Sequence, residues 1–469
     1  MSFTPISKDR FNSFFYGRTP FVKIFSKEIE WFEFRSNDVT LLSVVLFDKT
    51  DKDLNAVILG RDLRRKFRAI DIVVSKNTME ELNDDLNSRI EKLVAAHSDG
   101  LFFQGDEATS AFALFTHRLH PNKRNRYLKL LVEEPGYFPA KVMMEELAYW
   151  FHDPDGTFIR AMQGNEFNAR LFELYLSAMF YELDFESDRT HPQPDFLLKK
   201  MGLTVCVEAV TVAEEAVENE NKAINIDDFM REIALHAKEE MPFRFFRSLR
   251  KKVDHRPEPL KVPYWDLPHT QGHPFIIAIH DYSRSHSMSF SEPAIRSLLY
   301  GISLDEGVLS RIERHEKEGR TIPSNFFGNL KNKNISAVLL VTQATIPKFN
   351  RIGRVAGLRS PVDFAFVSGV RTDNKGVPKP FSALVEHPAY TEYWHEGAYL
   401  YHNPNAEHPV DEFLFSNLAQ IKVDQYGMSE RYPPNFTLRS TTQMMKVDPD
   451  KIDDIWSEFE KNIKDQDVI

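Results

Sequence analysis

Cysteine is almost absent from this chain, which has one cysteine, Cys206, among 469 residues. A single thiol forms no internal disulfide and no thiolate zinc cluster, so both kinds of stabilising centre are excluded. Long apolar runs are missing as well, since no segment reaches the ~18 continuous apolar residues that a membrane-spanning helix requires. The N-terminal segment MSFTPISKDRFNSFF also lacks the apolar core and small-residue cleavage site of a signal peptide. We therefore expect a cytoplasmic protein with no membrane partner.

Several widespread catalytic and nucleotide-binding motifs are missing too. The sequence contains no GxxxxGK[ST] phosphate loop, no GxGxxG between a strand and a helix, and no GxSxG elbow. The sequence therefore gives no support to a self-contained ATP-driven motor or to a serine hydrolase of the elbow type.

The charge is unevenly distributed along the chain. The net charge is −10, which excludes a protein that coats nucleic acid over its whole surface. Basic residues are nevertheless concentrated at 60–68, 116–129 and 244–261. Such segments can follow a phosphate backbone, although a solvated face is the alternative explanation. The candidate nucleic-acid-binding residues are Arg244, Arg247, Arg250 and Lys252.

Hydrophobic periodicity divides the chain into three regions. Residues 1–150 are expected to form an α+β region with an antiparallel meander and a helix capped by Thr78, and to contact substrate or a partner. Residues 151–345 are expected to form an α/β core in the order helix, three strands, helix, strand. Residues 346–469 are expected to be an α+β extension packed on that core.

One strand of the expected core carries an unusual charge. Glu208 interrupts the run LTVCVEAVTV at 203–212, which otherwise indicates a buried strand. Burying a carboxylate is costly unless a cation or a hydrogen-bond donor meets it. Asp195 begins the preceding strand, and pairing of the two strands around a turn at 200–202 would bring Asp195 and Glu208 together. The alternatives are that Asp195 is a simple turn residue and that Glu208 faces solvent on an edge strand.

A third carboxylate is available from the preceding helix. Glu166 and Glu173 lie about two helical turns apart and so share one helix face. Carboxylates that converge repel one another unless a divalent cation lies between them, and Mg²⁺ prefers such hard oxygen ligands. We predict a Mg²⁺ or Mn²⁺ site formed by Asp195, Glu208 and Glu173, with Glu166 in reserve. A metal of this kind suits phosphodiester hydrolysis, because it polarises the phosphoryl oxygen and lowers the pKa of a bound water.

These residues resemble the PD-(D/E)XK nuclease superfamily over residues 160–285. Pro194-Asp195 corresponds to the PD pair, Glu208-Ala209-Val210 to the acidic tripeptide, and Glu173 to the helix acid. The resemblance implies a restriction-endonuclease-like core, which is a central mixed sheet flanked by helices. It further implies a metal-dependent endonuclease that hydrolyses DNA in preference to RNA, of the kind that acts in bacterial antiviral defence.

The tripeptide departs from the superfamily pattern at its third position. Val210 replaces the lysine that helps to position the attacking water. The superfamily tolerates a lysine that has moved to the following helix, and here the segment FFRSLRKK offers Lys251, which we predict to be catalytic. The alternative is a catalytically degraded module that binds nucleic acid or a partner protein without cleaving. A homodimer and a protein partner are both left open.

Overall fold

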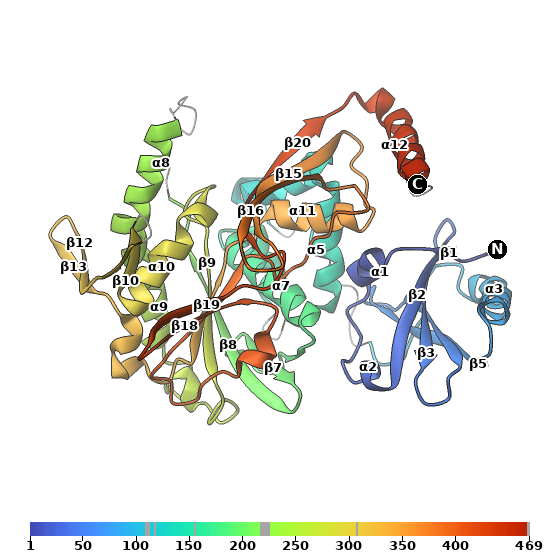
Figure 1. Ribbon diagram of the computed structural model, residues 1–469. Helices are drawn as coiled ribbons and strands as arrows, with labels where there is room; N and C mark the ends of the chain where they lie inside the picture. Colours follow the sequence, from blue (N-terminus) through green and yellow to red (C-terminus); the bar gives the residue numbers. More distant parts are fainter. Residues whose placement is uncertain (108–112, 117–118, 154–155, 216–225, 306–307, 467–469) are drawn as a thin grey trace.

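Two large sheets organise the chain, a five-stranded sheet near the N-terminus and an eight-stranded sheet beyond it (Figure 1). The computed structural model describes residues 1–107, 113–116, 119–153, 156–215, 226–305 and 308–466. Residues 117–118 of the basic segment at 116–129 lie outside this range. Within it, no helix combines the length and the apolar character needed to cross a bilayer.

The N-terminal sheet is an antiparallel meander, as the sequence predicts. Its strands run in chain order: β1 (Thr4–Pro5), β2 (Ser26–Arg35), β3 (Thr40–Asp48), β4 (Leu54–Arg61) and β5 (Phe67–Lys76). Helix α3 (Met79–Ala96) covers one face, and α1 (Lys8–Phe14) covers the other, followed by the short α2 (Val22–Phe25). The predicted cap is confirmed, because Thr78 Oγ1 accepts a hydrogen bond from the backbone N–H of Glu81 at 3.2 Å.

The eight-stranded sheet is mixed. Its order across the sheet is β19-β18-β17-β14-β9-β8-β7-β6, in which β8, β9 and β14 are mutually parallel and β7 is antiparallel to β8. The strands are β6 (Glu186–Asp188), β7 (Phe196–Lys200), β8 (Leu203–Val212), β9 (Phe275–Asp281), β14 (Ala337–Val341), β17 (Ala398–His402), β18 (Ala419–Asp424) and β19 (Gly427–Arg431). The central strand β9 is buried along its whole length, as expected for a strand covered on both faces.

Helices cover both faces of this sheet. Side chains alternate between the faces along β8, so Val205 and Val207 pack into one hydrophobic cluster, and Cys206 and Val210 into the other. The first cluster contains α5 (Phe138–Trp150), α7 (Phe167–Glu182) and α11 (Ile346–Val355), and the second contains α9 (Met241–Val253) and α10 (Ser291–Tyr300). The fold is therefore α/β, with a large mixed sheet flanked by helices. The lone thiol of Cys206 is a buried core side chain.

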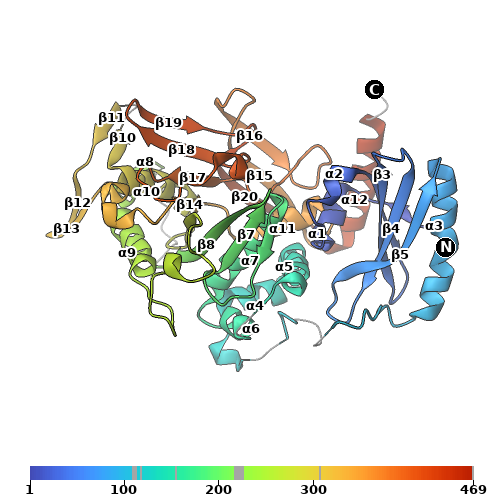
Figure 2. The same ribbon diagram turned by 90° about the horizontal axis from the view of Figure 1, so that it is seen from below.

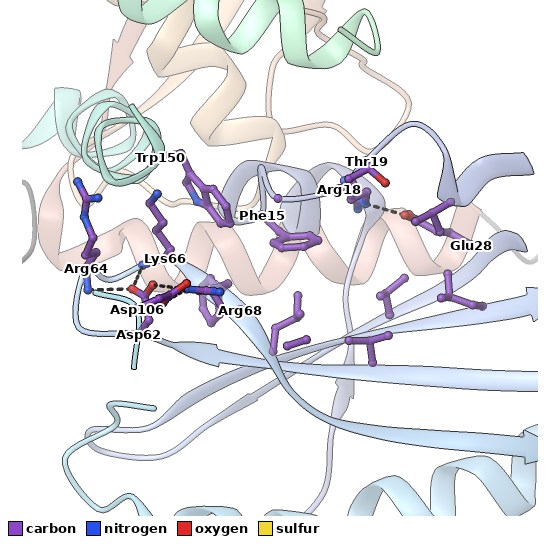
Figure 3. Close-up of a pocket in the computed structure, with 18 of the residues that line it drawn as sticks. Phe15, Arg18, Thr19, Glu28, Asp62, Arg64, Lys66, Arg68, Asp106 and Trp150 are labelled. Carbon is purple, nitrogen blue, oxygen red and sulfur yellow. Dashed lines mark hydrogen bonds and ion pairs between the residues drawn. The ribbon is translucent and has the colours of Figure 1, made fainter. Parts of the chain in front are cut away.

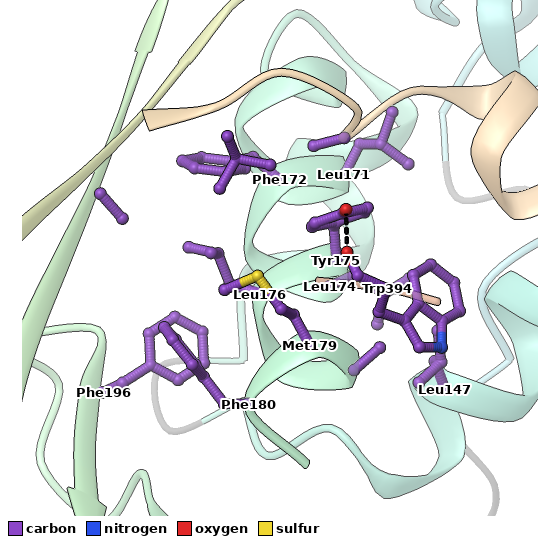
Figure 4. Packing of buried hydrophobic residues seen from close by; sticks show 14 of the residues in the cluster. Leu147, Leu171, Phe172, Leu174, Tyr175, Leu176, Met179, Phe180, Phe196 and Trp394 are labelled. Atoms are coloured by element: carbon purple, nitrogen blue, oxygen red, sulfur yellow. Dashed lines mark hydrogen bonds between the residues drawn. The ribbon is translucent and has the colours of Figure 1, made fainter. Parts of the chain in front are cut away.

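Helix α7 is apolar around most of its circumference. Figure 4 shows its side chains packed toward the sheet on one side and toward Trp394 on the other. Phe180 meets Phe196 of β7 edge-on at 5.3 Å, and the Tyr175 hydroxyl donates a hydrogen bond to the carbonyl of Trp394. A helix packed in this way holds its one deeply buried acid, Glu173, in a fixed position beside the sheet.

The C-terminal region joins the core more closely than expected. Strands β17, β18 and β19 continue the eight-stranded sheet, so the boundary predicted at residue 345 does not separate core from extension. A separate antiparallel sheet with the order β16-β15-β20 contains β15 (Asp363–Thr372), β16 (Pro378–Leu384) and β20 (Thr437–Lys446), and α12 (Ile452–Gln466) follows it. Smaller elements are α4 (Arg126–Glu133), α6 (Phe158–Gln163), α8 (Ile226–Leu235), β10 (Ile302–Asp305), β11 (Val308–Arg311), β12 (Arg314–Lys317) and β13 (Arg320–Pro323). In both views the N-terminal sheet lies to one side of the larger one (Figure 2).

Candidate active site

The hairpin of β7 and β8 brings Asp195 and Glu208 together, as the sequence predicts. The strands pair with Phe196 opposite Val207 and turn through Met201 and Gly202. At the open end of the hairpin, the backbone N–H of Asp195 donates to Glu208 Oε2 at 3.1 Å. The backbone N–H of Ala209 in turn donates to Asp195 Oδ2 at 2.8 Å. Each acid is thus held by the strand that carries the other.

Glu208 is a buried carboxylate in the middle of the sheet. It is 3% exposed, and β8 lies between β7 and β9, so the edge-strand alternative is wrong. Its Oε1 accepts hydrogen bonds from Lys252 Nζ at 2.5 Å and from the Tyr264 hydroxyl at 2.7 Å. One ammonium group, one hydroxyl and one backbone N–H therefore offset the burial of this charge.

The lysine that meets Glu208 is Lys252, and not Lys251 as the sequence predicted. Glu208 points to the same face of the sheet as Cys206 and Val210, which is the face that α9 covers. Adjacent residues on a helix are rotated by about 100°, so only one of two consecutive lysines can face the sheet. Lys251 is exposed, whereas the Lys252 side chain is 20% exposed and reaches inward.

The two acids predicted on the preceding helix lie in different surroundings. Glu173 of α7 is 6% exposed, and its carboxylate binds Arg170 at 2.8 Å and Arg189 at 3.2 Å. The Glu166 side chain is 60% exposed and binds the outer side of Arg170 at 2.9 Å. Glu166 therefore lies at the exposed N-terminus of α7. This position does not agree with its predicted use as an alternative metal ligand to Glu173.

Electrostatic repulsion links three of the carboxylates. Burial, reinforced by the negative charge of Asp195, raises the pKa of Glu208 to about 7. The same two causes raise the pKa of Glu173 to about 7. Burial alone would lower the pKa of Lys252, but the carboxylates of Glu208 and Asp195 outweigh it and raise that pKa. Near neutral pH the cluster thus favours the uptake of a proton or of a cation.

The carboxylates fit a magnesium ion only in part. Among the described residues, no three His, Cys, Asp or Glu side chains are placed to enclose a metal. Glu173 directs both carboxylate oxygens to arginines. Both oxygens of Glu208 and Oδ2 of Asp195 also accept hydrogen bonds from the protein. A carboxylate has about four acceptor sites, and Mg²⁺ is commonly held by one or two carboxylates together with water and phosphate oxygens. Of the predicted ligands, Asp195 and Glu208 are therefore the two that the fold brings together.

The other basic residues predicted on α9 differ in whether their side chains are free to contact a nucleic acid. Arg244 binds Glu215 and donates to the carbonyl of Ala213 at 2.7 Å, so its guanidinium is engaged inside the protein. Arg250 pairs with Asp254 within the helix terminus. Arg247 is exposed, as is Lys251, and these two are the α9 cations best placed to contact a phosphate from solvent.

Sequence reasoning missed three residues that shape the site. Tyr264, which donates to Glu208, lies in a 3₁₀ turn beyond α9, and no local pattern marks it. Arg189 follows β6 and reaches Glu173 only through the fold. Arg170 had a usable signal, because its spacing of three residues from Glu173 places the two on one helix face.

Comparison of the chain with protein-family models, with curated proteins and with solved structures finds no match in any of the three.

Proposed function

We propose that this protein is a metal-dependent nuclease that hydrolyses phosphodiester bonds, with DNA as the first substrate to test. The observation that carries the proposal is the contact of Lys252 with the Asp195–Glu208 pair, at 2.5 Å from Glu208 Oε1. One or two carboxylates can hold Mg²⁺ together with phosphate oxygens, a metal so held promotes phosphodiester hydrolysis, and the lysine adds a cation beside it.

The order of elements supports a PD-(D/E)XK-like core. Helix α7 carries Glu173, β7 and β8 carry Asp195 and Glu208, α9 carries Lys252, and β9 follows beside β8. Val210, at the usual lysine position, packs into the hydrophobic cluster under α9. A lysine from α9 reaches the same acid from above the sheet, which agrees with the migrated arrangement of the superfamily.

In this proposal each group of the site has its own role in hydrolysis. Asp195 and Glu208 would hold Mg²⁺ or Mn²⁺, which when bound polarises the phosphoryl oxygen and lowers the pKa of a water. The ammonium group of Lys252 would orient that water and offset negative charge on the phosphate. Arg247 and Lys251, exposed on the same helix, would hold the flanking phosphates. A role in antiviral defence rests on the resemblance alone.

Binding without cleavage is the second candidate function. It is favoured by the complete pairing of Glu173 with Arg170 and Arg189, which leaves that acid no oxygen directed at a metal. In this case Asp195 and Glu208 would be structural groups that Lys252 neutralises.

A cleavage assay separates the two candidates. The purified chain is incubated with plasmid, linear and single-stranded DNA and with RNA, in Mg²⁺, Mn²⁺ or EDTA. The nuclease proposal predicts metal-dependent products that Asp195→Asn abolishes, while Glu166→Gln, which changes an exposed acid of the same cluster, cleaves like the wild type. Cleavage that survives Asp195→Asn contradicts the assigned site. Absence of products together with retained binding of DNA supports the second candidate.

A further inference from the structure

A cavity away from the candidate active site lies between the N-terminal sheet and the end of α5, with a volume of about 530 Å³ (Figure 3). Its lining residues come from the N-terminal unit and from Trp150, and are separate from Asp195, Glu208 and Lys252. The inference drawn from it does not depend on the proposed nuclease activity. A volume of this size falls in the range of ~300–1,000 Å³ that small-molecule sites occupy.

The interior of this cavity is apolar. Val44 and Leu46 of β3 and Val57 and Leu59 of β4 line it from the sheet. Phe15 and Trp150 line it from the side of the helices, with their rings edge-on at 5.8 Å. Aliphatic and aromatic side chains arranged in this way favour a compact apolar body, above all a ring.

Four cations and four carboxylates line the same cavity. Asp62 and Glu107 accept backbone N–H groups, and the other two carboxylates pair with two of the cations. Arg18 binds Glu28 at 2.6 Å, and Arg68 binds Asp106 at 2.6 Å. Arg64 and Lys66 form no ion pair with a carboxylate among the described residues. Figure 3 shows the Lys66 side chain extending toward Trp150, with Arg64 on the other side of Lys66, and Lys66 Nζ lies 5.3 Å from the centre of the Trp150 ring.

The turn that carries Arg64 and Lys66 is built by a buried acid. Asp62 is 1% exposed, and its Oδ1 accepts the backbone N–H groups of Arg64 at 2.8 Å and Lys66 at 2.9 Å. Asp62 thus fixes the positions of both cations in the turn. Burial and the nearby charge of Arg64 lower the pKa of Lys66, and the charges of Asp62 and Asp106 oppose this shift without cancelling it.

We infer that this cavity binds a small organic anion that combines a ring-sized apolar body with one phosphate or carboxylate group. The apolar body would lie against the sheet and Phe15, and the anionic group would accept hydrogen bonds from Arg64 and Lys66. Such hydrogen bonds are charge-assisted and therefore stronger than bonds between neutral groups, so they would add to the affinity for the anion.

A matched series of probes tests the inference by isothermal titration calorimetry on the full chain. The probes are 1-naphthyl phosphate, 1-naphthoate and the uncharged 1-naphthol. We expect both anions to bind and 1-naphthol to bind about tenfold more weakly, because it lacks a charge-assisted hydrogen bond. Tighter binding of the phosphate than of the carboxylate identifies phosphate esters as the natural class, and the reverse order identifies carboxylates. Equal affinity for all three probes, or no heat from either anion at millimolar concentration, overturns the inference.

Three variants locate the binding to this cavity. Lys66→Gln should weaken both anions about tenfold and leave 1-naphthol unchanged. Arg65→Gln is the matched control, since Arg65 is exposed in the same turn and does not line the cavity. Ala69→Phe places a ring from β5 into the cavity without changing its charge and should block all three probes. Melting temperatures verify that each variant is folded. Wild-type affinity in both Lys66→Gln and Ala69→Phe contradicts the inference.

Discussion

Replacing Lys252 with methionine should destabilise the protein in a pH-dependent way. The substitution keeps a side chain of similar length but removes the ammonium group that contacts Glu208. Breaking a buried ion pair in this way typically costs ~3–5 kcal/mol, and we expect about 3 kcal/mol at pH 8 because water partly screens the lysine. The Lys252 side chain is 20% exposed and that of Glu208 is 5% exposed.

The dependence on pH follows from the raised pKa of Glu208. That pKa is about 7 in the folded protein against a usual 4.5, so the folded state binds more protons than the unfolded state between these values. The contribution of Glu208 to the free energy of unfolding is therefore largest at low pH and decreases as the pH rises toward 7. Loss of Lys252 raises the pKa further and extends the decrease above pH 7. The stability difference between variant and wild type should thus be larger at pH 8 than at pH 6.

Urea unfolding at pH 6 and pH 8 measures both effects. Lys251→Met is the matched control, because the same substitution on an exposed neighbour should change the free energy of unfolding by less than about 0.5 kcal/mol. Equal stability of the two variants at pH 8 would refute the reasoning. A large loss for Lys252→Met that is the same at both pH values would refute the assignment of Glu208 as the partner.

Three further substitutions test other parts of the structure, each followed by urea unfolding. Thr78→Ala removes the cap of α3 and should lower the free energy of unfolding by about 1 kcal/mol, against no change for the exposed Asn77→Ala. Tyr264→Phe removes a hydrogen bond to Glu208 and should cost about 1.5 kcal/mol at pH 8 and less at pH 6. Arg351→Leu leaves the buried Glu392 without its guanidinium partner and should cost about 3 kcal/mol, while Arg351→Lys should cost less. A loss as large in Arg351→Lys, or none in the other two variants, would contradict the contacts described.

Local sequence patterns predicted most of the secondary structure and the first half of the site. The alternation in 203–212, the turn at 200–202 and the position of Asp195 were enough to place the two carboxylates opposite each other, because pairing around a short turn fixes the register. The meander and the cap at Thr78 followed from local signals in the same way.

The remaining features depend on contacts that no local pattern specifies. The choice between Lys251 and Lys252 turns on the rotation of α9 over the sheet, which sequence periodicity gives only to within a residue. The hydroxyl of Tyr264 and the guanidinium of Arg189 arrive from distant segments. Strands β17 to β19 lengthen the core sheet for the same reason, since β17 joins it by pairing with β14, which lies more than fifty residues earlier in the chain.

The most direct test of the central claim compares cleavage by Lys252→Gln and Lys251→Gln with that by the wild type, in Mg²⁺ at pH 8 and at a temperature where all three are folded. The account predicts that Lys252→Gln loses about a hundredfold or more in rate, as general acid–base and charge-stabilising groups commonly contribute. Lys251→Gln should retain the chemical step and lose only part of its affinity for DNA. Wild-type rates in Lys252→Gln, or loss of the chemical step in Lys251→Gln alone, would contradict the account.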